Sequence, residues 1–308
     1  MLPLPPFSWE APDQLADLVA LAAAPGARLI AGGTDLLPSM KHGLFQPQTL
    51  VSLADVAELR GIREEQGGLS VGAMCTLAEV AAHPLVRERY PALAAACRTV
   101  ATPTIQGMGT LGGNLMLDTR CLYYNQPTGW RASLGGCLKA SGTVCHVART
   151  GTGCYAAHSA DTVPCLWLYG ARVALHGLAG SRDVAVSDLY GEDGRSWLKI
   201  QPGEILTRVQ LPPPGAPVGH RKLRLRGAID YAALLVAVQR TPEGSRAVLS
   251  ALGPSPLLVQ AAAGEDLAER AWAAAHPLST HAISTTWRKH MVRIEVRRAL
   301  AALESARG

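Results

Sequence analysis

Four of the seven cysteines fall in one polar stretch of the chain, where they could together bind a metal centre. They follow the pattern C-x15-C-x7-C-x8-C, at Cys121, Cys137, Cys145 and Cys154. Four thiolates can hold zinc or an iron–sulfur cluster. The spacing matches neither paired C-x-x-C zinc knuckles nor ferredoxin cysteine runs, so it does not decide between these metals. His146 and His158 lie in the same stretch, so mixed cysteine and histidine ligand sets are also open.

The stretch that holds these cysteines, residues 101–164, has little hydrophobic periodicity. Segments this long without elements of their own are usually functional or held by something other than protein. Because few long apolar side chains are present, a metal centre would supply the missing folding free energy. Aromatic neighbours could shield it from water: Tyr123, Tyr124, Trp130 and Tyr155. The remaining cysteines, Cys75, Cys97 and Cys165, lie in apolar contexts and are predicted to be buried small hydrophobic residues.

Two glycine-rich segments have the composition of anion-binding loops. In residues 29–36 (LIAGGTDL), two glycines, Thr34 and Asp35 follow a predicted strand and precede a helix, although the same residues also make an ordinary N-capped turn. Residues 107–112 (GMGTLG) match G-x-G-x-x-G, which in a Rossmann site needs a strand before and a helix after. Pro103 lies just upstream and no helical period follows, which argues against a Rossmann site. A tight turn or a non-Rossmann pyrophosphate loop are the alternatives. The two loops could share the two phosphates of one dinucleotide.

Composition indicates a folded chain that does not bind nucleic acid. The 308 residues are 48% apolar and 17% charged, which excludes a disordered chain. The net charge of +5 is too small and too dispersed to indicate nucleic acid. One basic cluster near the C-terminus is predicted to be the solvated face of a helix: Arg288, Lys289, Arg293, Arg297 and Arg298. No acid–base or nucleophile constellation is recognisable, so we expect no catalytic residue on this chain.

No apolar run approaches the roughly 20 residues of a membrane span. The N-terminal residues lack the basic and apolar regions of a signal peptide. An odd number of cysteines without such a peptide argues against a disulfide framework. We therefore expect a cytoplasmic chain with reduced thiols.

The elements that must position these residues form three groups. The first is a small α/β unit up to about residue 54, with helices over 12–24 and 34–41 and strands over 28–31 and 49–52. The second group begins with two short strands within 59–73 and a helix opened by the Thr76 and Glu79 capping box. It continues with a helix over 91–100, regular structure over 165–175, and strands near 183–186 and 205–211. A proline-rich linker at 212–215 precedes the third group. This group has strands at 221–225 and 247–251, an apolar run at 231–238 that fits either a strand or a helix, and a helix over about 285–304.

Three motifs carry a resemblance to a known family. AGGTD (Ala31–Asp35), TLGGNL (Thr110–Leu115) and the Asp-x-x-Pro element Asp161–Pro164 resemble the FAD-binding medium subunits of the xanthine oxidase family of molybdenum hydroxylases. RKLRLRGAID (Arg221–Asp230) loosely resembles a basic segment of that family. The resemblance covers nearly the whole chain and implies a mixed α+β fold. It implies a PCMH-type FAD-binding domain over 1–212, which consists of α/β subdomains 1–54 and 55–212 and contains a cluster-binding loop at about 118–158. It also implies an α+β CO dehydrogenase flavoprotein-like domain over 213–308.

A more specific resemblance lies in DTRCLYYNQPTGWR and the later cysteines, which are similar to the β subunits of 4-hydroxybenzoyl-CoA reductases. That branch of the family carries a [4Fe–4S] cluster in an inserted loop, so the resemblance implies that the four cysteines hold such a cluster. For FAD it implies a pyrophosphate site in Leu29, Ile30, Ala31, Gly32, Gly33, Thr34, Asp35 and Leu36, together with Thr110, Gly113 and Asn114. It further implies cofactor contacts from Val100, Leu117 and Asp161, and a place near the flavin for Lys222.

The function implied by this resemblance is that of an electron-transfer oxidoreductase subunit. Electrons would pass from the [4Fe–4S] cluster through FAD to [2Fe–2S] centres of a small subunit. A molybdopterin-binding large subunit would then reduce 4-hydroxybenzoyl-CoA to benzoyl-CoA, as in anaerobic aromatic degradation. The implied assembly is an (αβγ)2 heterohexamer supplied by a low-potential donor such as ferredoxin. Two alternatives are the FAD subunit of an aldehyde, xanthine or CO dehydrogenase-type hydroxylase, and a zinc-stabilised binding module without redox function.

Overall fold

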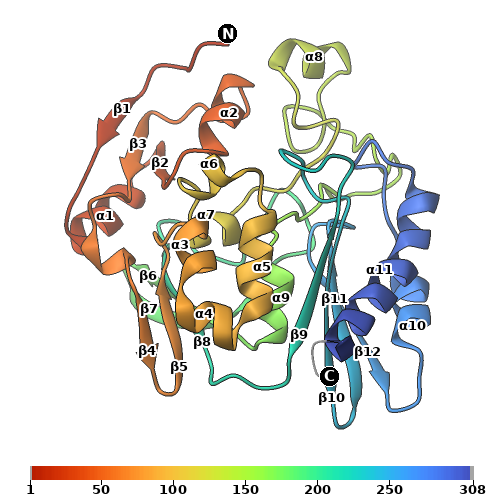
Figure 1. The fold of residues 1–308 in the computed structure, drawn as a ribbon. Coiled ribbons are helices and arrows are strands. Elements are labelled where there is room, and N and C mark those ends of the chain that lie inside the picture. Colours follow the sequence, from red (N-terminus) through yellow and green to blue (C-terminus); the bar gives the residue numbers. More distant parts are fainter. Residues whose placement is uncertain (1, 306–308) are drawn as a thin grey trace.

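The computed structural model describes residues 2–305, which form a mixed α+β fold of three sheets with helices packed against them (Figure 1). This is the fold class that the sequence predicts. The sheets follow one another along the chain, and each has its own hydrophobic core.

The first sheet has three parallel strands in the order β1-β3-β2. Parallel neighbours require crossover connections, which the two helices provide. Leu18 and Val19 of the first helix pack with Val51 of the central strand. The sequence did not predict β1, because its three residues are all exposed and carry no alternating pattern. The elements are β1 (Ser8–Glu10), α1 (Leu15–Ala22), β2 (Ala27–Ile30), α2 (Leu36–Lys41) and β3 (Thr49–Ser52).

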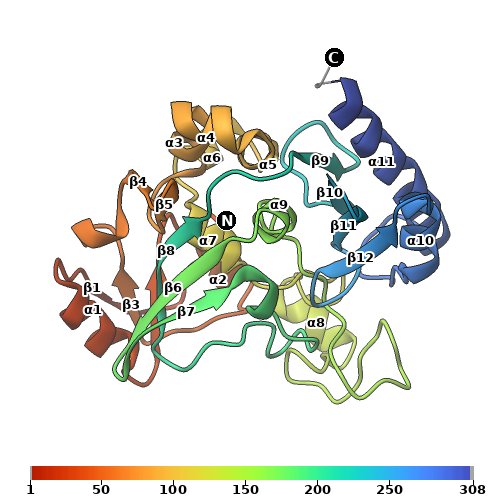
Figure 2. The same cartoon turned by 90° about the horizontal axis from the view of Figure 1, so that it is seen from below.

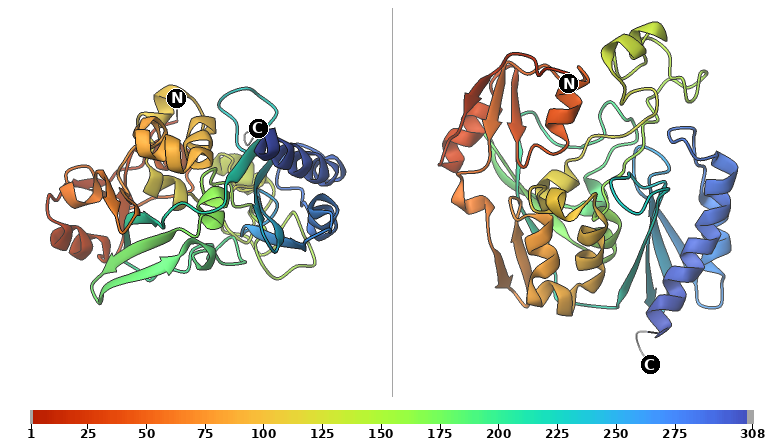
Figure 3. Two further views of the ribbon diagram at one scale, coloured as in Figure 1. Left: turned by 60° about the horizontal axis from the view of Figure 1, so that its bottom comes forward. Right: turned by 45° about the horizontal axis from the view of Figure 1, so that its top comes forward.

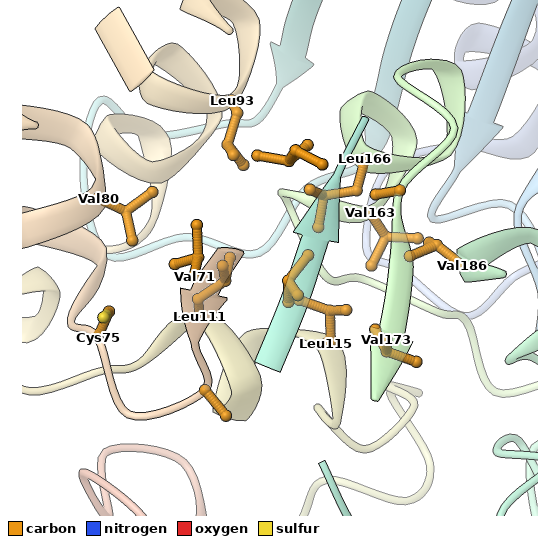
Figure 4. Close-up of a cluster of buried hydrophobic side chains, with 14 of the residues drawn as sticks. Val71, Cys75, Val80, Leu93, Leu111, Leu115, Val163, Leu166, Val173 and Val186 are labelled. Atoms are coloured by element: carbon orange, nitrogen blue, oxygen red, sulfur yellow. The ribbon is translucent and has the colours of Figure 1, made fainter. Parts of the chain in front are cut away.

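The second sheet has five antiparallel strands in the order β4-β5-β8-β6-β7, and its core is the largest in the molecule. Figure 4 shows Val71 and Val173 of this sheet facing Val80, Leu93 and Leu166 of the covering helices. The strands are β4 (Ile62–Glu65), β5 (Gly68–Gly72), β6 (Arg172–Gly177), β7 (Gly180–Ala185) and β8 (Ile205–Leu211). The main helices are α3 (Leu77–Ala82), α4 (Pro84–Arg89), α5 (Pro91–Thr99) and α9 (Val163–Leu168), with 3-10 turns at Ala57–Leu59 and Val186–Asp188. The predicted capping box opens α3, where the Thr76 hydroxyl accepts from the Glu79 amide at 3.1 Å.

Residues 101–164 contain three short helices that the sequence did not predict: α6 (Pro103–Gln106), α7 (Leu111–Leu115) and α8 (Thr128–Ser133). The residues of α7 (LGGNL) include two poor helix formers, and tertiary packing overrides that propensity because Leu111 and Leu115 are fully buried. We call residues 118–158 the cysteine segment. This segment lies between the first and third units of the chain (Figure 3). It contacts the first unit through Arg131, which donates to the Gly43 carbonyl, and it contacts the third unit through Leu122, whose amide donates to the Thr280 carbonyl.

The third sheet has four antiparallel strands in the order β12-β11-β10-β9. Two helices cover one face, where Val292 and Val296 pack against Val236. The other face packs on α5 and α9, so that α9 lies between the second and third sheets (Figure 2). The apolar run at residues 231–238, which fitted either a strand or a helix, contributes to the strand β10. The elements are β9 (Val218–Leu223), β10 (Leu234–Thr241), β11 (Gly244–Ser250), β12 (Leu257–Ala262), α10 (Leu267–Ala274) and α11 (Thr285–Ser305).

The basic cluster on α11 is not uniformly solvated, and the prediction was wrong for Arg288. Its side chain is fully buried and donates to the backbone carbonyls of Ala233, Leu278 and Ala251. The carbonyls of Ala233 and Ala251 accept no backbone N–H within residues 2–305, so the guanidinium satisfies them, whereas the Leu278 carbonyl also accepts from the Thr280 amide at 2.8 Å. Arg297, by contrast, is exposed and pairs with Glu269 of α10 and with its N-cap residue Asp266.

Replacing Arg288 with leucine should therefore lower the free energy of unfolding by about 3 kcal/mol or more, because several buried carbonyls lose their donor. Arg297→Leu removes only exposed ion pairs and should cost less than about 1 kcal/mol. Urea unfolding of both variants measures the difference. Equal losses would show that the contacts of Arg288 contribute no more than a surface ion pair.

Within residues 2–305, no helix is both long and apolar enough to cross a membrane.

Candidate functional site

The two glycine-rich loops, predicted to act together, touch each other in the structure. A Cβ atom on Gly32 would lie 1.8 Å from the carbonyl oxygen of Met108, so only glycine allows this approach. Gly33, with φ of 68°, needs the left-handed conformation that favours glycine. The second loop continues directly into α7, whose first turn is capped by the Thr110 hydroxyl accepting from the Gly113 amide at 3.0 Å.

The expectation that no helix follows the second loop was therefore wrong, because α7 begins inside it. The argument against a Rossmann site nonetheless holds. The segment before the loop is the helix α6 and not a strand, so the strand–loop–helix order of that motif is missing. The loop is a turn whose backbone lies against the first glycine-rich loop.

The first loop presents a row of free backbone donors. Among residues 2–305, no atom accepts a hydrogen bond from the amides of Gly32, Gly33, Thr34 or Asp35. Unpaired amides in one turn form a concavity that binds anions. The close contact of the second loop fixes the shape of this concavity. The pair of loops can thus hold a phosphorylated ligand.

Polar residues beyond the loops connect to the same region. The Asn114 side-chain oxygen accepts from the Thr162 amide at 3.2 Å and from the Thr162 hydroxyl at 2.7 Å. The neighbouring Asp161 forms an ion pair with Lys222 of β9, with 2.5 Å between Oδ1 and Nζ. Burial raises the pKa of Asp161, and the nearby ammonium of Lys222 opposes that rise. Val100 and Leu117 pack against the hydrophobic core of the second sheet.

The Asp161–Lys222 pair is buried, so removing one partner should be costly. Lys222→Met leaves a buried carboxylate without its cation and should reduce the free energy of unfolding by about 3 kcal/mol at pH 7. Because burial raises the pKa of Asp161, the variant should bind a proton there as the pH falls, and its deficit should shrink at low pH. The double variant Asp161→Asn, Lys222→Met should recover most of the loss. Urea unfolding at several pH values tests this, and a deficit that grows on acidification would contradict it.

The four cysteines of the cysteine segment line one cavity. Each is 6–8% exposed. Tyr123 and Tyr124 form part of the wall, whereas Trp130 is 41% exposed on α8 and does not shield the cavity as expected. His146 also lines it. His158 lies elsewhere, with Nδ1 2.8 Å from the Ser250 hydroxyl, so a ligand set that includes it is wrong.

No group of three or more His, Cys, Asp or Glu side chains in the described part of the chain is close enough to hold a single metal ion. The four cysteines instead share the wall of one cavity. Burial raises the pKa of Cys121 to about 11 and also raises that of Cys154, so these two side chains are thiols. Lys139 lines the same cavity, and its ammonium lies 2.5 Å from Asp118 Oδ1. The other three cysteines are buried in apolar cores, as predicted.

Sequence reasoning missed a contact that ties three parts of the chain together. Arg120 forms an ion pair with Asp35 of the first loop, and its guanidinium carbon lies 4.3 Å from the ring centroid of Tyr231. The Tyr231 hydroxyl donates to Asp35 Oδ1 at 3.0 Å. We call these residues the Asp35–Arg120–Tyr231 junction. The only sequence signal for Arg120 is its place before Cys121.

Known proteins resemble this chain over most of its length. The FAD-binding subunit of an aldehyde oxidoreductase from Escherichia coli is 31% identical, over 88% of this chain and 91% of that relative. The medium chain of carbon monoxide dehydrogenase from Afipia carboxidovorans is also 31% identical, over 80% of this chain and 73% of the relative. The crystal structure of quinoline 2-oxidoreductase from Pseudomonas putida superposes with a TM-score of 0.77 at 26% identity, covering 99% of both chains.

The fold, the paired loops and these similarities define an oxidoreductase subunit that binds FAD. Residues 5–214 match the family described as the FAD binding domain in molybdopterin dehydrogenase. The chain belongs to this family, the FAD-binding medium subunits of molybdenum hydroxylases of the xanthine oxidase type.

Proposed function

We propose that this chain is the flavin and iron–sulfur electron-transfer subunit of an enzyme of the 4-hydroxybenzoyl-CoA reductase type. One observation carries the proposal: four buried cysteines from a segment inserted between α7 and α9 line one cavity. The segment also contacts the first glycine-rich loop, because Arg120 pairs with Asp35 while the next residue, Cys121, lines the cavity.

We propose that this cavity holds a [4Fe–4S] cluster and not a zinc ion. Zinc requires four donors around one point, and no group of three or more His, Cys, Asp or Glu side chains among residues 2–305 is placed to hold one ion. Four thiolates at the corners of a cluster match four cysteines that line one cavity. The buried ammonium of Lys139 would offset part of the added negative charge. We infer that Cys121, Cys137, Cys145 and Cys154 are the ligands.

For FAD we propose the residues named above on the two loops, with Val100, Leu117, Asp161 and Lys222. The free amides of the first loop support this, because a diphosphate needs such donors. When bound, FAD and the cluster would let the chain relay electrons singly or in pairs to a partner. The chain's own residues would bind and orient the cofactors and exclude water. We also propose the domain boundaries at 54 and 212, with a cluster loop over 118–158.

Substrate chemistry would then occur on partner subunits. We propose a molybdopterin-binding large subunit and a [2Fe–2S] small subunit, in a heterohexamer supplied by a low-potential donor such as ferredoxin. The names of two relatives, both carbon monoxide dehydrogenase medium chains, support membership of a multisubunit enzyme.

A second candidate is the FAD subunit of a hydroxylase that acts on an aldehyde. The 31% identity to an aldehyde oxidoreductase subunit favours it. The two candidates differ in the reaction that the assembled enzyme catalyses.

The test is anaerobic co-expression of the chain with its large and small subunits, followed by iron, sulfide and flavin analysis and turnover assays. The reductase type predicts FAD, a four-iron cluster on this chain and dehydroxylation of 4-hydroxybenzoyl-CoA. Aldehyde oxidation without dehydroxylation would move the function to the second candidate. A colourless chain that contains zinc would contradict both and favour the binding module.

A further inference from the structure

The hydrogen bonding of Arg120 is incomplete although the side chain is largely buried. Only 16% of the side chain is exposed. Neither Nε nor Nη2 has a hydrogen-bond partner of acceptable geometry among residues 2–305, although Nη2 makes the ion-pair contact with Asp35. Buried N–H groups without acceptors are costly, so an anionic ligand that accepts hydrogen bonds from Nε and Nη2 would stabilise this side chain.

The place of Arg120 indicates which acceptor is missing. Its partner Asp35 belongs to the first loop, where four consecutive amides have no acceptor either. Two other buried cations are each paired already, Lys222 with Asp161 and Lys139 with Asp118. A carboxylate in a diphosphate-binding loop would repel the ligand unless a cation lay beside it. Arg120 is placed to supply that charge.

We propose that Arg120 binds the diphosphate of FAD, as a further cofactor-binding residue contributed by the cysteine segment. The proposal rests on the assignment of the first loop to the FAD diphosphate. Tyr231 holds the guanidinium by stacking and holds Asp35 by its hydroxyl, so the junction orients the cation toward the loop. Because Cys121 follows Arg120, the same short stretch connects the flavin site to the cysteine cavity.

The experiment compares flavins with and without the diphosphate. The full-length chain is freed of flavin and titrated with FAD and with riboflavin, with flavin fluorescence as the readout. Arg120→Gln should weaken FAD binding about tenfold or more and leave riboflavin binding within about threefold. Arg120→Lys keeps the charge and should lie between wild type and Arg120→Gln for FAD. It also serves as the test variant if Arg120→Gln does not fold.

Arg131 offers a matched control from the same segment. It is 7% exposed and donates to the carbonyls of His42 and Gly43, and no carboxylate among residues 2–305 pairs with it. Arg131→Gln should leave both affinities within about threefold of wild type. Unchanged FAD affinity in Arg120→Gln, or equal weakening for both flavins, would overturn the proposal. If the wild-type chain binds riboflavin and FAD equally well, the assignment of the loop to the diphosphate fails first, independently of Arg120.

Discussion

A chain with Gly32 replaced by alanine is expected to lose FAD. The added Cβ would lie 1.8 Å from the Met108 carbonyl oxygen and 2.6 Å from its carbon. Both are backbone atoms, which cannot rotate aside as a flexible side chain would, so the two loops must separate. The free amides of the first loop would then no longer be held against the second loop. We expect FAD affinity to fall on the order of a hundredfold.

The chain should stay folded, because neither Gly32 nor Met108 belongs to any of the three hydrophobic cores. Gly107→Ala is the matched control. It lies in the second loop, has a negative φ, and its added Cβ would have no heavy atom closer than 3.6 Å. This variant should keep FAD. The flavin-to-protein ratio after purification and far-UV circular dichroism give the comparison. Stoichiometric FAD in a folded Gly32→Ala chain would remove the loop contact from the flavin site.

The sequence predicted those parts of the fold that depend on local patterns. The strand Thr49–Ser52 was predicted with its observed bounds, and the capping box of α3 is present with both hydrogen bonds. Elements determined by tertiary contacts were missed. The helix α7 contains two glycines and forms because its leucines are buried, while Arg288 carries a charge into the core to satisfy carbonyls from distant segments.

The candidate site divides in the same way. Residue types and local order predicted that the two glycine-rich segments act together and that four cysteines share an environment. The Asp35–Arg120–Tyr231 junction could not be predicted, because Tyr231 and Asp35 are 196 positions apart. No periodic or compositional signal links residues at that separation. Only the packing of the cysteine segment against the first and third units brings them together.

Replacing Cys137 with serine is expected to remove most of the iron from the chain and to leave FAD bound. The Cys137 thiol lines the cavity with the other three cysteines, and a hydroxyl is a hard ligand that binds cluster iron poorly. The Asp161–Lys222 pair and the loop contact at Gly32 involve no residue of the cavity wall. Iron should therefore fall from about four per chain to less than half of that, with flavin close to the wild-type level.

Cys97→Ala is the control for this prediction, because Cys97 is fully buried in the core of the second unit and does not line the cavity. Alanine keeps that position apolar, so any loss of stability should be modest and the iron content should not change. Iron and acid-labile sulfide analysis of anaerobically purified chains, with the low-temperature electron paramagnetic resonance spectrum after reduction, distinguishes the two variants. If Cys97→Ala lost iron while Cys137→Ser retained it, the cavity would not be the cluster site. If the wild-type chain contained flavin and no iron, the four cysteines would be structural thiols and the cluster assignment would fail.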